Sequence, residues 1–168
     1  VRDLLQAVFV GELLSPSQCL WLVSPWISDV PCIDNQAGMF SAIEPSWGRG
    51  QITLCSILQK LLGQRDSFLV VATRPDPTNQ HFLTRLQRSV EEERAEQRLT
   101  VQQRTDLHMK GILGDQFHIG GSMNITYNGI QILDEMVTYD TDPSAIAEAR
   151  IGFLEHYGGP KCVGEDRR

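Results

Sequence analysis

The chain has 168 residues, 41% of them hydrophobic and 21% charged, which is the composition of an ordinary globular protein rather than of a disordered chain. This length suits one domain that buries roughly 70% of the surface of its unfolded chain. A formal net charge of −6 argues against tight, non-specific binding to DNA, which requires a basic face. No apolar run approaches the ~20 residues of a membrane span, and Asp3 and Glu12 lie where a signal peptide would be uncharged, so we expect a cytoplasmic protein without a membrane partner.

The four cysteines give no sign of a metal or disulfide framework. They form no Cys-x-x-Cys pair and do not cluster with histidine, which favours reduced, structural thiols. The sequence also lacks an acidic cluster of the kind that binds metals. We therefore expect neither a metal nor a cofactor. The cysteines are Cys19, Cys32, Cys55 and Cys162.

Helix and strand signals alternate through the first half of the chain. Apolar residues on one side predict a helix over 3–14, and the apolar stretch 20–27 predicts the first strand. The polar segment 27–47, interrupted by prolines and a glycine, is either an irregular connection or a mobile rim of a site. Leucine and isoleucine at helical spacing predict a helix over 54–62 that stops at a glycine. The uninterrupted apolar run 68–73 predicts a central strand covered on both faces.

The second half continues this alternation. A loop leads into a helix for which Asn79 is the candidate cap, and which extends to about Gln97. Four strands follow, and Asp142 and Pro143 then begin a last helix that continues to Gly158. The four strands are expected at Leu99–Gln103, Leu107–Leu113, Gln116–Gly120 and Ile130–Tyr139.

Strands separated by helices that pack on both faces predict an α/β fold, specifically an α/β/α sandwich with a mixed β-sheet. We expect a single domain over residues 1–158. Residues 159–168 have too little apolar content to order themselves and are predicted to be a disordered tail.

The segment 107–124 carries the candidate chemistry. Successive side chains of a strand point to opposite faces, so His108 and Lys110 would share one face and place a nucleophile beside a cation. Two glycines then allow a tight turn that brings the Ser122 hydroxyl and the Asn124 amide toward the same point. Together these groups predict a binding site for a tetrahedral oxyanion.

This segment resembles the His-x-Lys-x4-Asp and Gly-Ser-x-Asn signature of the phospholipase D superfamily, known as the HKD motif. The loop between its two parts is one residue shorter than in the family. Glu135 lies eleven residues after Asn124, where the family carries a carboxylate that orients the histidine. The Ser-Pro-Trp exit of the first strand is also similar, so the resemblance extends from about Leu20 to Tyr157. The matching motif residues are His108, Lys110, Asp115, Gly121, Ser122 and Asn124.

The resemblance implies the phospholipase D-like α/β/α fold and a working site built from two motifs. Because this chain holds one motif, it implies a homodimer whose active site is shared across the twofold axis. Gly120, Gly121 and Asp115 would support the turn structurally. Trp26 is either a stacking platform or an ordinary core residue. The candidates for a substrate rim are Trp26, Arg49, Arg74 and Tyr127.

The reaction itself can be argued from the chemistry of a phosphodiester, whose negative charge repels nucleophiles. Lys110, Ser122 and Asn124 would donate hydrogen bonds to the non-bridging oxygens. His108 would attack phosphorus through one nitrogen, while Glu135 accepts a hydrogen bond from the other and fixes the tautomer. The second subunit's histidine would protonate the leaving oxygen and later activate water against the phosphohistidine. No metal is required.

Three functions fit these residues. The leading hypothesis is a metal-independent phosphodiesterase that acts as a nuclease on DNA. The second is hydrolysis of a phospholipid headgroup, which would want an apolar entry surface that the sequence does not show. The third is a catalytically weak dimeric module that holds DNA or partner proteins in a defence complex, which the acidic charge and the shortened loop favour.

A narrower resemblance favours a role in defence. The single motif and the stretches Ser-Pro-Trp and Leu-Asp-Glu-Met-Val-Thr-Tyr are similar to phospholipase D-like proteins of bacterial gene clusters that install and police 7-deazaguanine bases in DNA. This resemblance implies restriction of foreign DNA together with partner proteins, which would supply the specificity that an acidic nuclease lacks.

Overall fold

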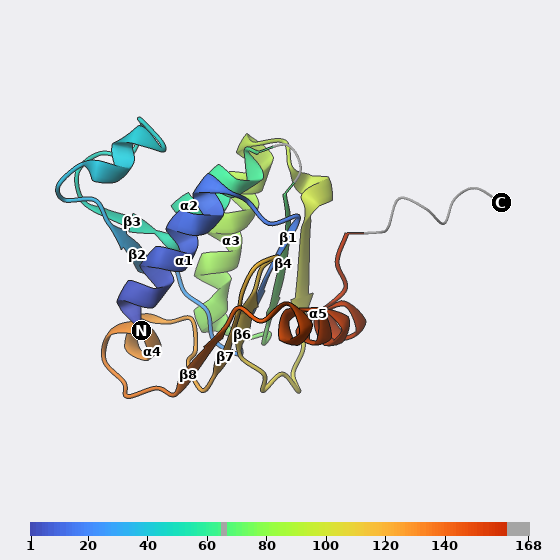
Figure 1. Cartoon of the computed structure of the whole chain (residues 1–168). Coiled ribbons are helices and arrows are strands. Elements are labelled where there is room, and N and C mark those ends of the chain that lie inside the picture. Colours follow the sequence, from blue (N-terminus) through green and yellow to red (C-terminus); the bar gives the residue numbers. More distant parts are fainter. Residues whose placement is uncertain (65–66, 161–168) are drawn as a thin grey trace.

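A computed structural model describes residues 1–64 and 67–160 (Figure 1). Six strands form one mixed sheet in the order β5-β4-β1-β6-β7-β8. The strands β1, β4 and β5 run parallel to one another, and β6, β7 and β8 continue the sheet as an antiparallel meander. The predicted α/β class with a mixed sheet is therefore confirmed. The strands are β1 (Cys19–Val23), β4 (Phe68–Thr73), β5 (Leu99–Gln103), β6 (Gly111–Leu113), β7 (His118–Gly121) and β8 (Val137–Asp140).

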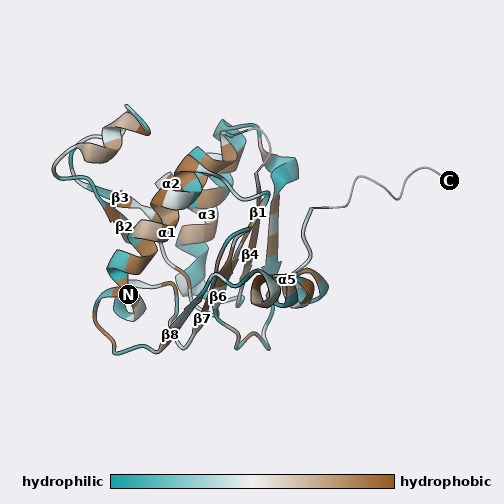
Figure 2. Cartoon of the chain, in the orientation of Figure 1, coloured by the Kyte–Doolittle hydropathy of each residue, from teal (hydrophilic) through white to brown (hydrophobic). Residues whose placement is uncertain are grey.

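Helices cover both faces of this sheet. The helices α1 (Arg2–Leu14), α2 (Leu54–Leu62) and α3 (Pro77–Glu92) lie on one face, and α5 (Pro143–Tyr157) lies on the other (Figure 1). Side chains of β1 alternate between two cores: Leu22 packs under α1–α3, whereas Trp21 packs under α5. Figure 2 shows the apolar residues concentrated on the central strands and on the helix surfaces that face them. Covering both faces explains why β1 and β4 are continuous apolar runs.

The long helices begin and end close to the expected residues. The helix α2 has the predicted bounds, and Asp142 caps α5 with Pro143 in its first turn. Two details of α3 were predicted wrongly. Its cap is Asp76, which accepts a hydrogen bond from Thr78 N and precedes a first-turn proline, and the helix ends at Glu92. Asn79 is buried instead, and its side chain bonds the backbone of the segments that follow β1 and β4.

Several predicted strands are shorter than expected: the first, predicted over 20–27, ends at Val23 as β1, and the one predicted over 116–120 begins at His118 as β7. The strand predicted over 107–113 is only β6, so His108 and Lys110 lie in the connection before it rather than on one strand face. The cause is β1: Val23 pairs with Gly111, and the chain then leaves the sheet, so residues before Gly111 have no strand to pair with. The segment predicted as a strand over 130–139 begins inside a short helix, α4 (Tyr127–Gln131), and only β8 is extended.

The polar stretch 27–47 contains secondary structure that the sequence pattern did not indicate. The strand β2 (Pro31–Asp34) pairs with β3 (Gln51–Thr53) in a separate two-stranded sheet, and a 3-10 helix, η1 (Met39–Ala42), lies between them. This excursion projects on the far side of α1 from the main sheet (Figure 1). Of the predicted tail, residues 161–168 lie outside the described part of the chain.

Buried thiols contribute to both cores. Cys19, Cys32 and Cys55 are buried and unpaired, and burial raises the pKa of Cys19 and of Cys32 to about 12. Such thiols pack as small apolar side chains. Cys162 lies outside the described residues. No helix in the described part is both long and apolar enough to cross a membrane.

Candidate functional site

The predicted site lies at the sheet edge where β1 and β4 end and β6 begins. Val23 at the end of β1 pairs with Ala72 of β4 and with Gly111 of β6, and Gly111 in turn pairs with Gly120 of β7. The segments that leave these strands therefore meet at one edge, at the bottom of Figure 1. The sequence predicts a catalytic role for the residues at this edge, and we refer to it as the catalytic edge.

His108 is exposed at this edge and lies against Arg74. The Arg74 Nη2 lies 3.0 Å from Nδ1 and 3.3 Å from Nε2 of the imidazole. Arg74 follows β4 directly, and its Nε donates to the Leu107 carbonyl oxygen at 2.8 Å. The structure thus places a predicted rim residue in contact with the candidate nucleophile. A guanidinium is a strong partner for phosphate oxygens, so a phosphate that reaches His108 also reaches Arg74.

Lys110 provides a second cation. Its Nζ donates to the His108 carbonyl oxygen at 3.1 Å, and its side chain is half-buried at the start of β6. An ammonium group has three donors, so two are left for a bound anion. Lys110 also lines a small cavity with Gly121 and Met123, which shows that the two halves of the motif lie side by side.

Ser122 and Glu135 contact each other rather than the histidine. The Ser122 hydroxyl donates to Glu135 Oε2 and accepts from the Met136 backbone N–H at 3.1 Å. In the described residues, the side-chain contacts of His108 come from Arg74, and Glu135 has no hydrogen bond to the imidazole. In this arrangement the Ser122 proton is committed to Glu135. Ser122 was predicted to donate a hydrogen bond to a phosphate oxygen. In the structure, it holds the loop before β8 instead.

Two glycines shape the backbone around these groups. Gly121 has φ +139°, and a Cβ atom there would collide with the Met136 carbonyl oxygen, so the close approach of β7 to the loop before β8 needs glycine. Gly129 in α4 packs on the backbone of Asn124, where a Cβ atom would collide with its carbonyl oxygen. Gly129 could not be identified from the sequence, because its requirement for glycine comes from the backbone contact with Asn124 in the folded chain.

Asn124 is positioned by Ser24, the first residue of the Ser-Pro-Trp stretch after β1. The buried Ser24 hydroxyl donates to the Trp26 carbonyl oxygen at 2.7 Å and accepts from the Ile125 N–H at 3.1 Å. It lies 3.5 Å from Asn124 Oδ1. The amide oxygen of Asn124 therefore faces Ser24, which leaves its NH₂ group to donate to a ligand.

The buried Asn79 joins the exits of β1 and β4. Its Oδ1 accepts from the Ile27 N–H at 2.8 Å, and its Nδ2 donates to the carbonyl oxygens of Pro25 at 3.0 Å and Arg74 at 2.9 Å. These bonds satisfy a fully buried amide and fix the backbone that carries Trp26 and Arg74. The guanidinium of Arg74 then lies 5.2 Å from the centroid of the Trp26 ring.

The other two rim candidates lie in different parts of the molecule. Tyr127 is exposed at the start of α4, three residues after Asn124. Arg49 lies beside Gly38, in the connection that leads into β3. The excursion formed by this connection, β2 and β3 projects away from the catalytic edge, at the upper left of Figure 1, so one chain does not bring this predicted rim residue to the edge.

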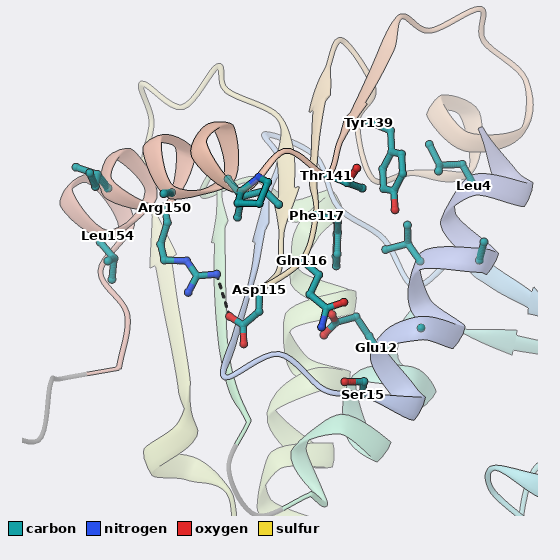
Figure 3. A pocket seen from close by; sticks show the side chains of 17 residues that line it. Leu4, Glu12, Ser15, Asp115, Gln116, Phe117, Tyr139, Thr141, Arg150 and Leu154 are labelled. Carbon is teal, nitrogen blue, oxygen red and sulfur yellow. Dashed lines mark ion pairs between the residues drawn. The ribbon is translucent and has the colours of Figure 1, made fainter.

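Asp115 lies in the turn between β6 and β7, at the end of the sheet opposite to the catalytic edge. Its Oδ2 accepts from the Gln18 N–H at 2.7 Å, and its Oδ1 lies 3.0 Å from Arg150 of α5 (Figure 3). Its own N–H donates to the Ser17 hydroxyl at 2.7 Å, and that hydroxyl donates to Glu12 of α1. Asp115 therefore joins the start of β1 to two helices.

The catalytic edge can hold an anion without a metal ion. Lys110 and Arg74 supply positive charge, and Asn124 supplies a neutral donor. The His108 side chain is exposed to solvent beside Arg74, so a ligand can approach it. Within residues 1–64 and 67–160, no group of three or more His, Cys, Asp or Glu side chains is placed to bind a metal ion. The arrangement fits a phosphate or another tetrahedral oxyanion.

Comparisons with known proteins identify a fold and no family. No protein-family model matches the sequence, and no curated protein matches it significantly. Among solved structures, the chain is similar to TrmBL2, an archaeal chromatin protein whose structure is described as showing a novel mode of DNA binding. The TM-score is 0.51 at 14% sequence identity, over 89% of this chain and 46% of that protein. The chain thus spans less than half of the length of TrmBL2, and the likeness establishes a shared α/β architecture.

Proposed function

We propose that this chain is a metal-independent phosphodiesterase of the phospholipase D type, acting as a nuclease on DNA through a phosphohistidine intermediate. The observation that supports it most is the position of His108, which is exposed with the Arg74 guanidinium against its imidazole and with Lys110 bonded to its backbone carbonyl oxygen, at the edge that also carries Asn124. A phosphodiester bound there would have its charge neutralised directly beside a nucleophile.

The steps follow from these positions. Lys110, Arg74 and Asn124 bind the non-bridging oxygens, and an imidazole nitrogen of His108 forms a bond to phosphorus as the bond to the leaving oxygen breaks. A second histidine donates a proton to that oxygen, then removes a proton from the water that cleaves the phosphohistidine. The other histidine of the motif segment, His118, packs against Phe153 on the α5 face instead. We therefore propose that the second histidine is His108 of a second copy in a homodimer.

A surface for this second copy lies next to Ser122 and Glu135. The loop between α4 and β8 exposes Ile132, Leu133 and Met136, with exposed fractions of 63%, 57% and 76%. Apolar side chains that gather beside a site are commonly covered by a partner. A twofold copy seated on this loop would bring two catalytic edges together.

Two observations support a nucleic-acid substrate. The local cations make a nucleic acid possible despite the net charge of −6, and a fold shared with a protein described as binding DNA is compatible with it. From the resemblance of the motif we further propose that partner proteins supply specificity in the restriction of foreign DNA.

Two observations favour the alternatives. Glu135 bonds Ser122, and within residues 1–64 and 67–160 no carboxylate is hydrogen-bonded to the His108 imidazole, which favours a catalytically weak binding module. The exposed apolar loop is also the kind of entry surface that a phospholipid phosphodiesterase would need.

Cleavage of a generic phosphodiester after removal of metals tests the chemistry. Protein dialysed against EDTA should hydrolyse bis(4-nitrophenyl) phosphate and DNA, and His108→Ala should abolish both reactions. His156→Ala is the matched control, because His156 is an exposed histidine whose Nδ1 contacts only the Gly152 carbonyl of its own helix. A requirement for added magnesium, or full turnover in His108→Ala, would contradict the mechanism. Faster hydrolysis of lipid vesicles than of DNA would favour the phospholipid alternative.

The shared site is tested by mixing subunits. Wild type and His108→Ala are unfolded together and refolded so that subunits pair at random. If each site needs both histidines, activity should fall as the square of the wild-type fraction and leave about a quarter at an equal mixture. Independent sites would leave half, and a monomer in sedimentation experiments would also overturn the dimer.

A further inference from the structure

Trp26 differs from the core aromatic residues in its exposure and in its neighbours. It lies three residues after the end of β1 and is 38% exposed, whereas Trp21, inside β1, is 2% exposed. The backbone of Trp26 is fixed by the Ser24 hydroxyl and by the Asn79 bonds to the residues on either side of it. The Arg74 guanidinium lies over its ring. The indole is therefore held rigidly at a place where over a third of its surface is open to solvent.

The same Arg74 side chain connects this ring to the nucleophile. Its guanidinium carbon lies 5.2 Å from the Trp26 ring centroid, and its Nη2 lies 3.0 Å from His108 Nδ1. A group that stacks on the indole would thus lie one side chain away from a phosphate bound at His108. A nucleotide has this combination, with a flat base joined to a charged phosphate.

We propose that Trp26, backed by Arg74, is a stacking platform for an unpaired nucleobase next to the scissile phosphate, so that the site takes single-stranded or locally unpaired nucleic acid. This inference rests on the proposed phosphodiesterase function. Both faces of a base are covered in a duplex, so stacking on a protein ring requires a base that has left the helix.

The charge of the protein supports the same substrate. With a net charge of −6, the acidic residues outnumber the cations, so the protein as a whole repels a duplex backbone and binding must come from local contacts. Base–aromatic stacking contributes about 1–3 kcal/mol per base and tolerates any base sequence. A stacking platform can therefore provide affinity that the overall charge does not.

Binding measured without cleavage tests the platform separately from the reaction. All proteins carry His108→Ala, and the probes are a labelled single-stranded oligodeoxynucleotide, the same backbone with abasic sites in place of its central bases, and a duplex. Trp26→Ala should weaken binding of the base-containing single strand by about 5- to 150-fold, the equivalent of 1–3 kcal/mol. Trp26→Phe should restore most of this loss, because a phenyl ring still stacks.

The abasic strand should bind weakly and equally to the proteins with and without Trp26→Ala. Tyr139→Ala is the control, since it removes an exposed aromatic side chain that lines the groove beside Asp115, away from the catalytic edge. In protein with an intact Trp26, the base-containing strand should also quench tryptophan fluorescence, and Trp26→Phe should remove that quenching while Trp21 and Trp47 remain.

The outcomes separate this inference from the proposed function. Base-dependent binding that is lost in Trp26→Ala and regained in Trp26→Phe supports the platform, whether or not the wild-type protein cleaves DNA. Equal binding of base-containing and abasic strands, or a preference for the duplex, overturns it even if the wild-type protein is an active nuclease.

Discussion

The two ends of the sheet use the polar residues of one motif in opposite ways. At the catalytic edge, His108 is exposed with Arg74 against its imidazole, and Lys110 Nζ and Asn124 Nδ2 keep donor capacity that the described residues do not use up. At the other end, Asp115 is engaged by Gln18 and by Arg150, in a network that joins α1, β1 and α5. A motif of fixed spacing thus combines a reactive part with a structural part, and the β6–β7 hairpin carries them to opposite ends.

The hollows of the molecule follow the structural part rather than the reactive one. A groove of about 940 Å³ opens between α1 and α5 beside Asp115, and its walls are mostly apolar (Figure 3). The cavity next to Lys110 measures about 10 Å³. This cavity is too small to enclose a substrate by itself, which is compatible with the proposal that a second subunit completes the site.

After the complete loss expected for His108→Ala, the largest predicted effect on turnover comes from the Asn124 amide at the catalytic edge. Asn124→Ala should lower turnover by about 10²–10³, because it removes one neutral hydrogen bond to the charge that develops on the phosphate. The free energy of unfolding should change little, since the backbone of Asn124 stays packed on Gly129. Steady-state rates and urea unfolding measure the two quantities. Asn128→Ala, an exposed amide in α4, is the control, and an equal loss of rate in both variants would refute the role of Asn124.

A smaller effect is expected from the Ser122–Glu135 contact. Glu135→Gln should lower turnover by about 10- to 100-fold, the usual cost of losing a residue that orients a catalytic group. The amide keeps a hydrogen bond but loses the charge that favours an imidazolium. A pH–rate profile distinguishes the two possible roles. A shifted profile supports an electrostatic effect on a histidine, whereas unchanged rates would leave Glu135 as a support for Ser122 alone.

The opposite end of the sheet should respond in stability rather than in rate. Asp115→Ala leaves the Gln18 N–H without its acceptor and breaks the ion pair with Arg150, which should lower the free energy of unfolding by about 1–3 kcal/mol. Turnover of the folded protein should stay within about twofold of wild type, by the separation of the two ends. Asp106→Ala is the control, because its pair with Arg104 is exposed and should matter less. A large loss of turnover without a loss of stability would give Asp115 a direct role in catalysis.

The elements that the sequence predicted well are those whose signals are local. The apolar spacing and terminal glycine of α2 lie within ten residues, as does the apolar run of β4, and both elements have their predicted bounds. The start of β6 depends instead on where β1 leaves the sheet. A signal that comes from such a distant partner was therefore missed. The helix α4 was missed for another reason: it has five residues, held by the Thr126 cap and by the contact of Gly129 with Asn124, and is too short to show a helical apolar pattern.

The same limit applies to the site. Spacing alone predicted that His108, Lys110, Ser122 and Asn124 would lie at one edge, because one hairpin carries all four. Arg74 is 34 residues from His108, and Ser24 is 100 residues from Asn124. Residues at such separations come together only through the order of the strands, which a single sequence does not specify. Their contacts, and the pairing of Glu135 with Ser122, had to be seen in the structure.

The smallest effect expected is a pH dependence of stability from Glu12, at the end of the sheet that carries Asp115. Glu12 is 5% exposed, and burial raises its pKa, helped by Asp115 and opposed by hydrogen bonds from Ser17. Because the folded state binds this proton more tightly than the unfolded chain does, stability should fall as pH rises from the ordinary pKa of 4.5 through the raised value. The free energy of unfolding of wild type should therefore decrease relative to that of Glu12→Gln over this window, in urea titrations at several pH values.

Glu44→Gln is a control of opposite sign: Lys60 lowers the pKa of Glu44 to about 2, so its contribution to stability is present above pH 4.5 and is lost as pH falls toward 2. Parallel curves for wild type and Glu12→Gln would show that the network of Glu12, Ser17 and Asp115 does not hold a perturbed carboxyl.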